Sequence, residues 1–423
     1  MSRRSTVKGI NRLNAFEGNH APVTRRLSKQ RTTIARVEQR RRSFCVDWAD
    51  GHQSQFHYIW LRHNCFCAHC GSSTDGIRSL TIPAIPRDVR PSSHSLDEVG
   101  NLSVTWSDDD HHSSYGTEWL RTYCYSNAER ERRLSFRPQL WKAEFAEQFP
   151  TLSYAQIEAH DEARLNLYEL LRDYGIVEIT GVGTDPGQTE RVANLLGPIH
   201  PTSVYGTIFD LRSERLARAA GKTVIHQEPH TDDAFYYSAP GVAVFHFLAN
   251  TRGGGGESVY VDGFAVAESL RLEQRRAFEL LSTVPIQHHR RHHGEIDMRS
   301  HAPLIQLDRH GRLSGVRYFD RATAPLDVPA ETMEAMYEAL RQYALRMTSA
   351  EFKVERLVAA GCAMFVDNHR VMHARNAFPA DSDRHLRLCV VDREEFHARL
   401  RILGSQFERD SYDWVLPAGS TAT

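Results

Sequence analysis

Residues 225–232 read IHQEPHTD, and this segment gives the first indication of chemistry in the chain. His230 and Asp232 are two positions apart, so on an extended backbone both side chains point to one face. An imidazole and a carboxylate on one face can bind the same metal ion. His226 and Glu228 share that face, so a different cluster of His226, Glu228 and His230 stays open. That cluster would suit a cupin-like zinc or manganese isomerase or hydrolase.

A second segment, FVDNHRVMH at residues 365–373, predicts a strand followed by a turn that returns His373 to the same face. Two histidines and one carboxylate on one side of an octahedral ion leave three positions free, which is the arrangement of non-haem iron(II) oxygenases. A 2-oxo acid would occupy two of these positions and O2 the third. Arg384 follows His373 by eleven residues, at the start of the next predicted strand. Its planar guanidinium suits the far carboxylate of 2-oxoglutarate.

The C-terminal half alternates between predicted strands and a few helices. Apolar residues at a helical period end at Gly175, which stands where a C-terminal cap would lie. Strands are predicted at 176–180, 242–248, 258–261, 315–319, 362–366 and 386–391, and further helices at 264–281 and 332–347. Irregular strand spacing with inserted helices favours a mainly β fold, a sandwich or barrel with helical buttresses, over a parallel βαβ array.

A smaller β-rich domain is predicted before this half. Phe44 begins an alternating run that turns at Asp50-Gly51 and resumes as far as Trp60, which is typical of a β-hairpin. Three cysteines crowd together just after it, a pattern that suits a metal site better than a disulfide framework. The predicted division is a basic arm at 1–42, the β domain at 43–125, a connection at 126–150, the larger domain at 151–405 and a tail at 406–423.

Charge and composition indicate a globular intracellular protein. The 423 residues carry a net charge of −1, but residues 1–42 hold twelve Lys or Arg against Glu17 and Glu38. We expect a disordered, solvated arm; a mitochondrial presequence and a nucleic-acid-binding arm are the alternatives. No apolar run is long enough to cross a bilayer, and no secretory signal is evident. The seven cysteines fit a reducing compartment, so we expect a cytoplasmic protein, or a mitochondrial one if the arm is a presequence.

Several motifs between residues 44 and 403 together resemble one family. They are WLRHNC at 60–65, YG at 205–206, HTD at 230–232, PGV at 240–242, GGES at 255–258, VDGF at 261–264, DN at 367–368 and RHL at 384–386. The chain resembles the γ-butyrobetaine hydroxylase group of the taurine-dioxygenase-like 2-oxoglutarate oxygenases. The resemblance implies a double-stranded β-helix (jelly roll) with iron(II) at His230, Asp232 and His373. It also implies 2-oxoglutarate held by Arg384 with help from Ser258, O2 as oxidant, ascorbate as a supporting reductant, and a homodimer.

The same resemblance assigns the N-terminal cysteines to a structural zinc ion. It aligns Cys65, Cys67, Cys70 and His111 with zinc ligands, and His112 would take the place of His111 if the alignment shifted by one residue. Three thiolates and one imidazole complete a tetrahedral zinc site and leave no position for catalysis. Small domains with little core gain folding free energy from such a metal.

The substrate end departs from the family. Members that hydroxylate γ-butyrobetaine hold its trimethylammonium group in an aromatic cage by cation–π attraction. Tyr205 persists and Phe209 replaces a larger aromatic residue, but Lys222 and Val390 stand where two further tyrosines would be. A lysine would repel a quaternary ammonium. We therefore predict hydroxylation of a C–H bond in a related small molecule with an anionic group near Lys222 (a betaine, an amino acid or an aminophosphonate), with release of succinate and CO2.

Aromatic and basic residues elsewhere leave other functions open. Tyr236 and Tyr237 could restore an aromatic wall, and the alternative is then a γ-butyrobetaine or trimethyllysine hydroxylase proper. The basic run at 288–293 is interpreted as a solvated loop. A non-enzymatic alternative is a zinc-ribbon protein whose basic arm binds nucleic acid. We expect a small-molecule substrate and neither a membrane nor a nucleic-acid partner.

Overall fold

A computed structural model describes residues 32–71, 77–107, 109–133, 136–212, 222–251, 254–292 and 294–407. The chain divides into two compact units, the first ending at Phe136 and the second spanning Arg137–Phe407. Most of the predicted basic arm and most of the predicted tail lie outside the described residues. Among the residues described, no helix is both long and apolar enough to cross a membrane.

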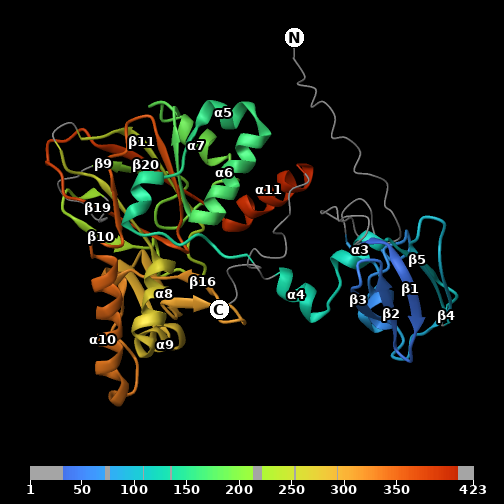
Figure 1. Cartoon of the computed structure of the whole chain (residues 1–423). Coiled ribbons are helices and arrows are strands. Elements are labelled where there is room, and N and C mark those ends of the chain that lie inside the picture. The colour runs from blue at the N-terminus through green and yellow to red at the C-terminus, as the bar shows by residue number, and fades with distance from the viewer. Residues whose placement is uncertain are drawn as a thin grey trace, which may run out of the picture. The chain divides into compact units, whose positions relative to one another are not determined.

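The N-terminal unit contains two three-stranded antiparallel sheets (Figure 1). The first consists of β1 (Ile34–Gln39), β2 (Ser43–Trp48) and β3 (Gln53–His57), and the second of β4 (Pro91–Leu96), β5 (Leu102–Trp106) and β6 (His112–Tyr115). The predicted hairpin of β2 and β3 is confirmed, with Gly51 at a φ of 83° in its turn. Regular structure is present inside the range assigned to the arm, because β1 pairs with β2 there.

A short helix replaces the end of the predicted hairpin. β3 stops at His57 and α2 (Tyr58–His63) follows, so the prediction of a strand as far as Trp60 is wrong. Tyr58 and Leu61 are three residues apart, and both are buried in the aromatic core of this unit, as one face of a helix allows. The clustered cysteines follow directly after α2. The unit also contains the 3-10 helix η1 (Ile82–Ala84) and the helices α3 (Thr117–Thr122) and α4 (Asn127–Arg133).

Two sheets form the core of the C-terminal unit. Their strands are β7 (Thr151–Ser153), β8 (Ile176–Thr180), β9 (Phe209–Arg212), β10 (Gln227–His230), β11 (Val242–Ala249), β12 (Ser258–Asp262), β17 (Lys353–Arg356), β18 (Ala363–Asp367), β19 (Val371–Arg375) and β20 (His385–Val391). The larger sheet has the order β7-β8-β18-β11-β20-β9, and the smaller sheet has the order β10-β19-β12-β17. Apart from the parallel pair β7–β8, the paired strands of both sheets are antiparallel. The predicted mainly β architecture is confirmed.

Side-chain alternation along β11 shows how the sheets pack. Ala243, Phe245 and Phe247 belong to a buried cluster that also contains Tyr260 of the smaller sheet. Val242 and Val244, which alternate with them, belong instead to a cluster with the helices on the outer face. The larger sheet therefore has one face against the smaller sheet and one against helices, as in a jelly roll.

Helices cover the outer faces of both sheets (Figure 1). The larger sheet is covered by α5 (Tyr154–Ala159), α6 (Asp161–Tyr174), α7 (Gln188–Ala193) and α11 (Arg393–Gln406), and the smaller one by α8 (Gly263–Glu273), α9 (Arg275–Thr283) and α10 (Ala330–Met347). α6 ends at Gly175 as predicted, at a φ of 75°, where a Cβ would lie 2.9 Å from Val371 Cγ2. The helix predicted at 264–281 is interrupted at Gln274, so it forms α8 and α9.

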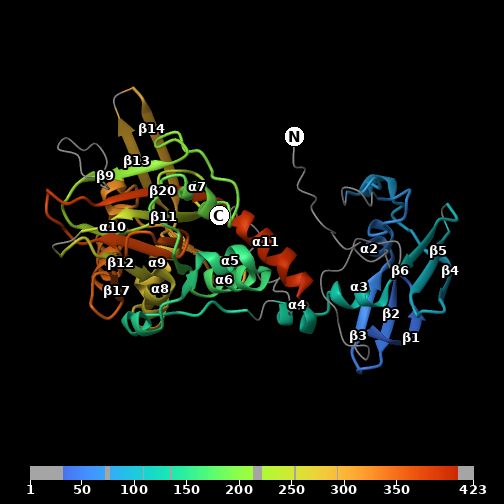
Figure 2. The ribbon, with the colours of Figure 1, turned by 90° about the horizontal axis from the view of Figure 1, so that it is seen from above.

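The basic run at 288–293 is not a solvated loop, so that prediction is wrong. Its described residues belong to β13 (Ile286–His292), which pairs with β14 (Ile296–Ala302) in a long hairpin (Figure 2). His288 is only 2% exposed. The polar composition of this run favoured the prediction of a loop, although the run forms a strand in which alternate residues face inward.

Two further boundaries differ from the prediction. The strand expected at 315–319 is β16 (Leu313–Val316), which pairs with β15 (Ile305–Leu307) and ends earlier. The predicted connection at 126–150 is divided between the two units. Its second half contains the 3-10 helix η2 (Ala143–Gln148), and the backbone N–H of Trp141 donates to Asp262 Oδ2 at 3.1 Å, so this half packs within the C-terminal unit.

Candidate metal centres and active site

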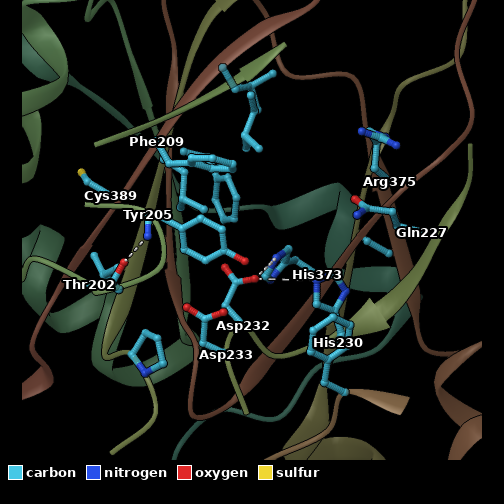
Figure 3. A pocket seen from close by; sticks show the side chains of 18 of the residues that line it. Thr202, Tyr205, Phe209, Gln227, His230, Asp232, Asp233, His373, Arg375 and Cys389 are labelled. Atoms are coloured by element: carbon cyan, nitrogen blue, oxygen red, sulfur yellow. Dashed lines mark hydrogen bonds and ion pairs between the residues drawn. The ribbon is translucent and has the colours of Figure 1, made fainter. Parts of the chain in front are cut away.

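The first candidate metal centre lies on the smaller sheet. His230 ends β10 and His373 lies in β19, and the two are direct cross-strand partners with ring centroids 4.6 Å apart. The carboxylate of Asp232 completes the group. Its Oδ1 is 3.7 Å from Nε2 of His230 and 3.5 Å from Nε2 of His373 (Figure 3). The structure therefore brings together the three residues that the sequence singled out.

These separations fit a shared metal ion. Two ligand atoms at right angles and about 2.1 Å from an ion are about 3.0 Å apart, so shifts of under about 1 Å would close the site. In the described chain this is one of two groups of His, Cys, Asp or Glu whose ligand atoms all lie within 4.8 Å of one another. His226 and Glu228 are not part of it. They pair with each other at 3.4 Å and are 46% and 61% exposed, which leaves the cupin-like alternative without a site.

The protonation state of His230 suits metal binding. Its Nδ1 lies 2.8 Å from the backbone oxygen of Glu228, so Nδ1–H donates there and Nε2 keeps its lone pair for a metal. Burial, followed by the neighbouring His373, lowers the pKa of His230 to about 4. The imidazole is therefore neutral at pH 7, as a ligand must be.

The carboxylate is held by a turn and not by the extended backbone that the sequence predicted. β10 ends at His230, and Asp232 lies in the turn that follows. The side chain of buried Asn368 clamps this turn, because its Oδ1 accepts from the backbone N–H of Asp232 at 2.6 Å and its Nδ2 donates to the backbone oxygen at 3.0 Å. Although burial alone would raise the pKa of Asp232, the adjacent His373 and His230 hold it below its usual value.

A second tether fixes the same turn. The backbone N–H of Thr231 donates to the backbone oxygen of Tyr318 at 2.8 Å, and the side-chain Oγ1 of Thr231 accepts from the backbone N–H of Tyr318 at 3.0 Å. Arg317, 4% exposed, donates to the backbone oxygens of Tyr236 and Tyr237 at 2.9 and 3.0 Å. These positioning residues were not predicted, because nothing in their local sequence pattern shows that they contact a turn some 80 residues away.

The metal centre opens into a cavity of about 420 Å³. Arg384 and Ser258, both predicted to bind 2-oxoglutarate, line this cavity and are 6% and 7% exposed. Arg384 Nε has no hydrogen-bond partner among the described residues. Burial, followed by the charge of Arg375, lowers the pKa of Arg384 to about 10. A buried guanidinium of this kind favours an anionic ligand.

Arg375 is a cavity residue that the sequence analysis missed. It lines the cavity two positions after His373 on β19, and its Nη2 donates to the backbone oxygen of Ile225 at 2.7 Å. The period of two along a strand could have revealed it, because residues 373 and 375 share one face. Figure 3 shows Arg375 and Gln227 on one side of the His-Asp-His group and Tyr205 and Phe209 on the other.

The other end of the cavity contains two aromatic residues that the sequence predicted. The ring centroids of Tyr205 and Phe209 lie 4.6 Å apart, and Val390 also lines the cavity. Lys222 is not among the lining residues, but its Nζ lies 5.1 Å from the centroid of the Phe209 ring. Tyr236 and Tyr237 do not restore the wall. Neither lines the cavity, and Tyr237 is 87% exposed.

Charged residues that the sequence analysis did not assign also border this end. Arg290 comes from β13, in the run interpreted as a loop. Asp233 follows Asp232 in the turn at a φ of 50° and is 6% exposed. Burial and the charge of Asp232 raise the pKa of Asp233 to about 8. Figure 3 shows Asp233 beside Asp232, on the side of Tyr205.

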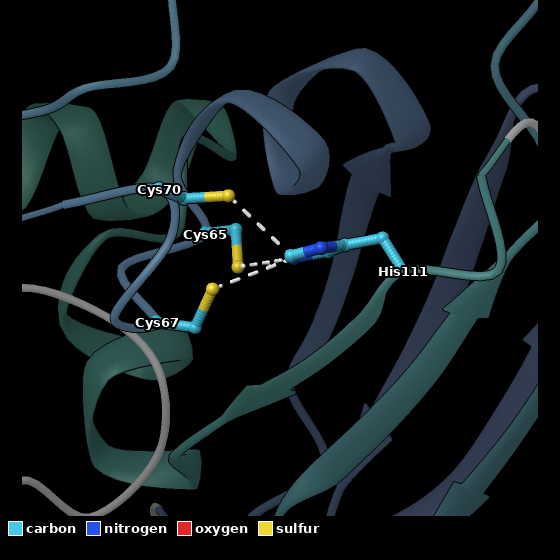
Figure 4. Close-up of side chains that lie close together, drawn as sticks. All are labelled: Cys65, Cys67, Cys70 and His111. Atoms are coloured by element: carbon cyan, nitrogen blue, oxygen red, sulfur yellow. Dashed lines mark hydrogen bonds between the residues drawn. The ribbon is translucent and has the colours of Figure 1, made fainter.

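The second candidate metal centre lies in the N-terminal unit (Figure 4). The sulfur atoms of Cys65, Cys67 and Cys70 converge on Nε2 of His111 at 3.3, 3.5 and 3.5 Å. One ring nitrogen carries at most one proton and cannot donate it to three sulfurs. A tetrahedral zinc ion with Zn–S of about 2.3 Å and Zn–N of about 2.0 Å would separate sulfur and nitrogen by about 3.5 Å, so the residues fit that ion.

A buried arginine supports this centre. Arg62 donates to Cys70 Sγ at 3.4 Å and forms a salt bridge with Asp109 at 3.0 Å. Asp109 in turn accepts from the backbone N–H of His111 at 3.0 Å. Such contacts orient the ligands and favour the thiolate form.

Comparison with known proteins gives the family. Residues 135–390 match the taurine catabolism dioxygenase TauD, TfdA family, and residues 35–121 match the N-terminal domain of γ-butyrobetaine hydroxylase-like proteins. This chain belongs to the TauD/TfdA dioxygenase family. As a member it is a 2-oxoglutarate-dependent dioxygenase that uses iron(II), which confirms the enzyme prediction and overturns the non-enzymatic alternative.

Several relatives align with most of this dioxygenase. It is 33% identical to the γ-butyrobetaine dioxygenase of Pseudomonas sp. (strain AK-1), an alignment that covers 85% of this chain and 93% of that protein. The human γ-butyrobetaine dioxygenase is 29% identical, with 85% and 94% covered. The human mitochondrial trimethyllysine dioxygenase is 30% identical, with 83% of each covered.

Proposed function

We propose that His230, Asp232 and His373 hold iron(II), that Arg384 binds the distal carboxylate of 2-oxoglutarate, and that the enzyme hydroxylates a C–H bond of a small molecule related to γ-butyrobetaine. One observation carries the proposal. Three ligand atoms converge at a cavity that also contains a buried arginine, and this arginine forms no salt bridge with a described residue. An open metal site and a buried cation in one cavity suit a chelating dianion.

In this proposal, the residues on one side of the metal bind the co-substrate and those on the other side bind the substrate. On one side, Arg384 with Ser258 would fix the far end of 2-oxoglutarate, so that its oxo-acid end reaches the metal. On the other side, Tyr205 and Phe209 would bind the substrate with its C–H bond toward the metal. Iron(II), when bound, supplies oxygen activation. The net reaction consumes O2 and 2-oxoglutarate; one oxygen atom enters the hydroxyl group and the other enters succinate, with release of CO2.

The N-terminal centre has a different proposed role. Cys65, Cys67, Cys70 and His111 would bind a structural zinc ion, because their four donors complete a tetrahedron and leave no free position. A homodimer, a cytoplasmic location and support by ascorbate stay predictions.

Histidine substitutions test the proposal directly. His230→Ala should abolish 2-oxoglutarate-dependent succinate formation, because two remaining ligands hold the metal poorly. His226→Ala is the matched control. His226 directly precedes β10, the strand that ends at His230, but its side chain is 46% exposed and pairs with Glu228. Succinate release would be measured with iron(II), ascorbate and a panel of betaines, amino acids and phosphonates. Equal activity in His230→Ala and His226→Ala would remove His230 from the ligand set.

A further inference from the structure

The substrate end of the cavity contains a cation supplied by the protein itself. Arg290 extends from β13, the strand that replaces the predicted loop. Its guanidinium carbon lies 5.2 Å from the ring centroid of Tyr205 and 5.4 Å from that of Phe235. The guanidinium also donates a hydrogen bond to the hydroxyl of Tyr205. Two aromatic rings thus already bind a cation at cation–π distance.

The neighbouring ring of Phe209 also has a positive side chain over it. The ammonium of Lys222 lies 5.1 Å from the centroid of Phe209, the ring that packs against Tyr205. Each of these three aromatic rings therefore has a positive side chain over it. A trimethylammonium group would have to displace these cations and would be repelled by them, because like charges disfavour each other in a partly buried site.

The guanidinium of Arg290 keeps donors for a ligand. Arg290 forms no salt bridge with any residue that the structure describes, and the hydroxyl of Tyr205 takes only one of its five N–H groups. Five arginines line the cavity as a whole, but Arg384 and Arg375 belong to the co-substrate side. At the substrate end, with Asp232 assigned to the metal, the charges of Arg290 and Lys222 outnumber the single carboxyl group of Asp233, which favours an anion.

We propose that Arg290 determines substrate specificity by binding an oxyanion group, a carboxylate or a phosphonate, where a cage for trimethylammonium would otherwise lie. This inference rests on the proposed function, since it names the class of substrate for the same site. A planar guanidinium held on aromatic faces presents its remaining N–H groups in its own plane, where a carboxylate or phosphonate can accept two of them.

Binding of three probes of similar length tests the inference: γ-butyrobetaine, glutarate and 4-phosphonobutyrate. Each would be titrated into the full-length enzyme with iron(II) and saturating 2-oxoglutarate, without O2, while the visible charge-transfer band of the iron–2-oxoglutarate complex is followed. We expect at least one anionic probe to bind about tenfold more tightly than γ-butyrobetaine. The glutarate and phosphonobutyrate arms distinguish the two kinds of oxyanion.

Variants give the decisive comparison. Arg290→Ala should weaken the preferred anion at least about tenfold and tighten γ-butyrobetaine, because it frees the rings of Tyr205 and Phe235. Arg290→Lys should retain part of the anion affinity. Arg299→Gln is the matched control on the same hairpin; Arg299 is 66% exposed and pairs with Asp297. An unchanged 2-oxoglutarate band would show that each variant is folded.

The outcomes distinguish a failure of the role proposed for Arg290 from a failure of the proposed iron site. Three outcomes with a normal 2-oxoglutarate band would overturn the role of Arg290 alone. They are γ-butyrobetaine binding as tightly as the anions, none of the probes binding, and Arg290→Ala weakening the binding of all probes by the same factor. Absence of the band in the unmodified enzyme would overturn the iron site, and the inference with it.

Discussion

The two candidate metal centres differ in their donors and in what surrounds them. The N-terminal centre offers four donors, three of them sulfur, which complete a tetrahedron. The C-terminal centre offers three donors and opens into a cavity of about 420 Å³. The former can accept no further ligand, whereas the latter has room for a co-substrate and O2.

The two centres also differ in how they relate to the surrounding fold. His230 and His373 lie on paired strands of a sheet that is packed on both faces, so that sheet does not need a metal to form. Cys65, Cys67 and Cys70 lie between elements, and His111 joins them from just before β6. We infer that one metal ion stabilises the fold and that the other acts in the reaction.

The largest expected effect follows from breaking the N-terminal centre. Cys65→Ser should remove cooperative unfolding of that unit, because apparent zinc-binding free energies in small domains reach about 10 kcal/mol. Calorimetry of the full chain, with and without a chelator, measures this. Cys45→Ser is the control, a buried cysteine of β2 outside the cluster. A Cys65→Ser unfolding profile equal to that of Cys45→Ser would contradict the structural role.

A smaller effect is expected from the co-substrate end of the open centre. Arg384→Met should raise the KM for 2-oxoglutarate about a hundredfold, which corresponds to about 3 kcal/mol for a charged hydrogen-bonded pair, and should leave the melting temperature nearly unchanged. Steady-state kinetics over a range of 2-oxoglutarate concentrations tests this. Arg387→Met is the control, since Arg387 lies in β20, the strand that begins directly after Arg384, but does not line the cavity. The same rise in both variants would exclude a specific role for Arg384.

The smallest effect is expected from Asn368, which contacts the turn and not the metal. Asn368→Ala removes both clamps on the backbone of Asp232, and we expect about a tenfold loss of iron affinity. Excess iron(II) should then restore much of the activity, which a purely structural lesion would not allow. Asn376→Ala, at a half-buried site that contacts Glu257, is the control. If excess iron(II) failed to restore activity, Asn368 would not act through the metal site.

The candidate metal-binding residues were more predictable than the residues that line the cavity around them. His230 and Asp232 lie two residues apart, and strand pairing of β10 with β19 brings His373 to them, so spacing and order carried the information. Arg384 was placed by its distance in sequence from His373. Short apolar runs also predicted five of the ten strands of the two sheets, because strands buried on both faces are apolar along most of their length.

The substrate end could not be predicted in the same way. Arg290 reaches the cavity only because β13 pairs with β14, and the basic composition of that segment concealed its alternation. The turn at Asp232 depends on Asn368 and Arg317, whose partners are far away in sequence. Lys222, expected in the pocket wall, reaches Phe209 without lining the cavity. Tertiary contacts, and not local pattern, determine these positions.

Metal content tests the division of roles between the two centres most directly. The full-length enzyme and His373→Ala would be loaded with iron(II) without O2, freed of excess metal, and analysed for iron and zinc per chain. We predict one iron and one zinc in the unmodified enzyme, and zinc without iron in His373→Ala. Two results would contradict two separate sites with separate roles. One is iron retained in His373→Ala, and the other is loss of both iron and zinc in that variant.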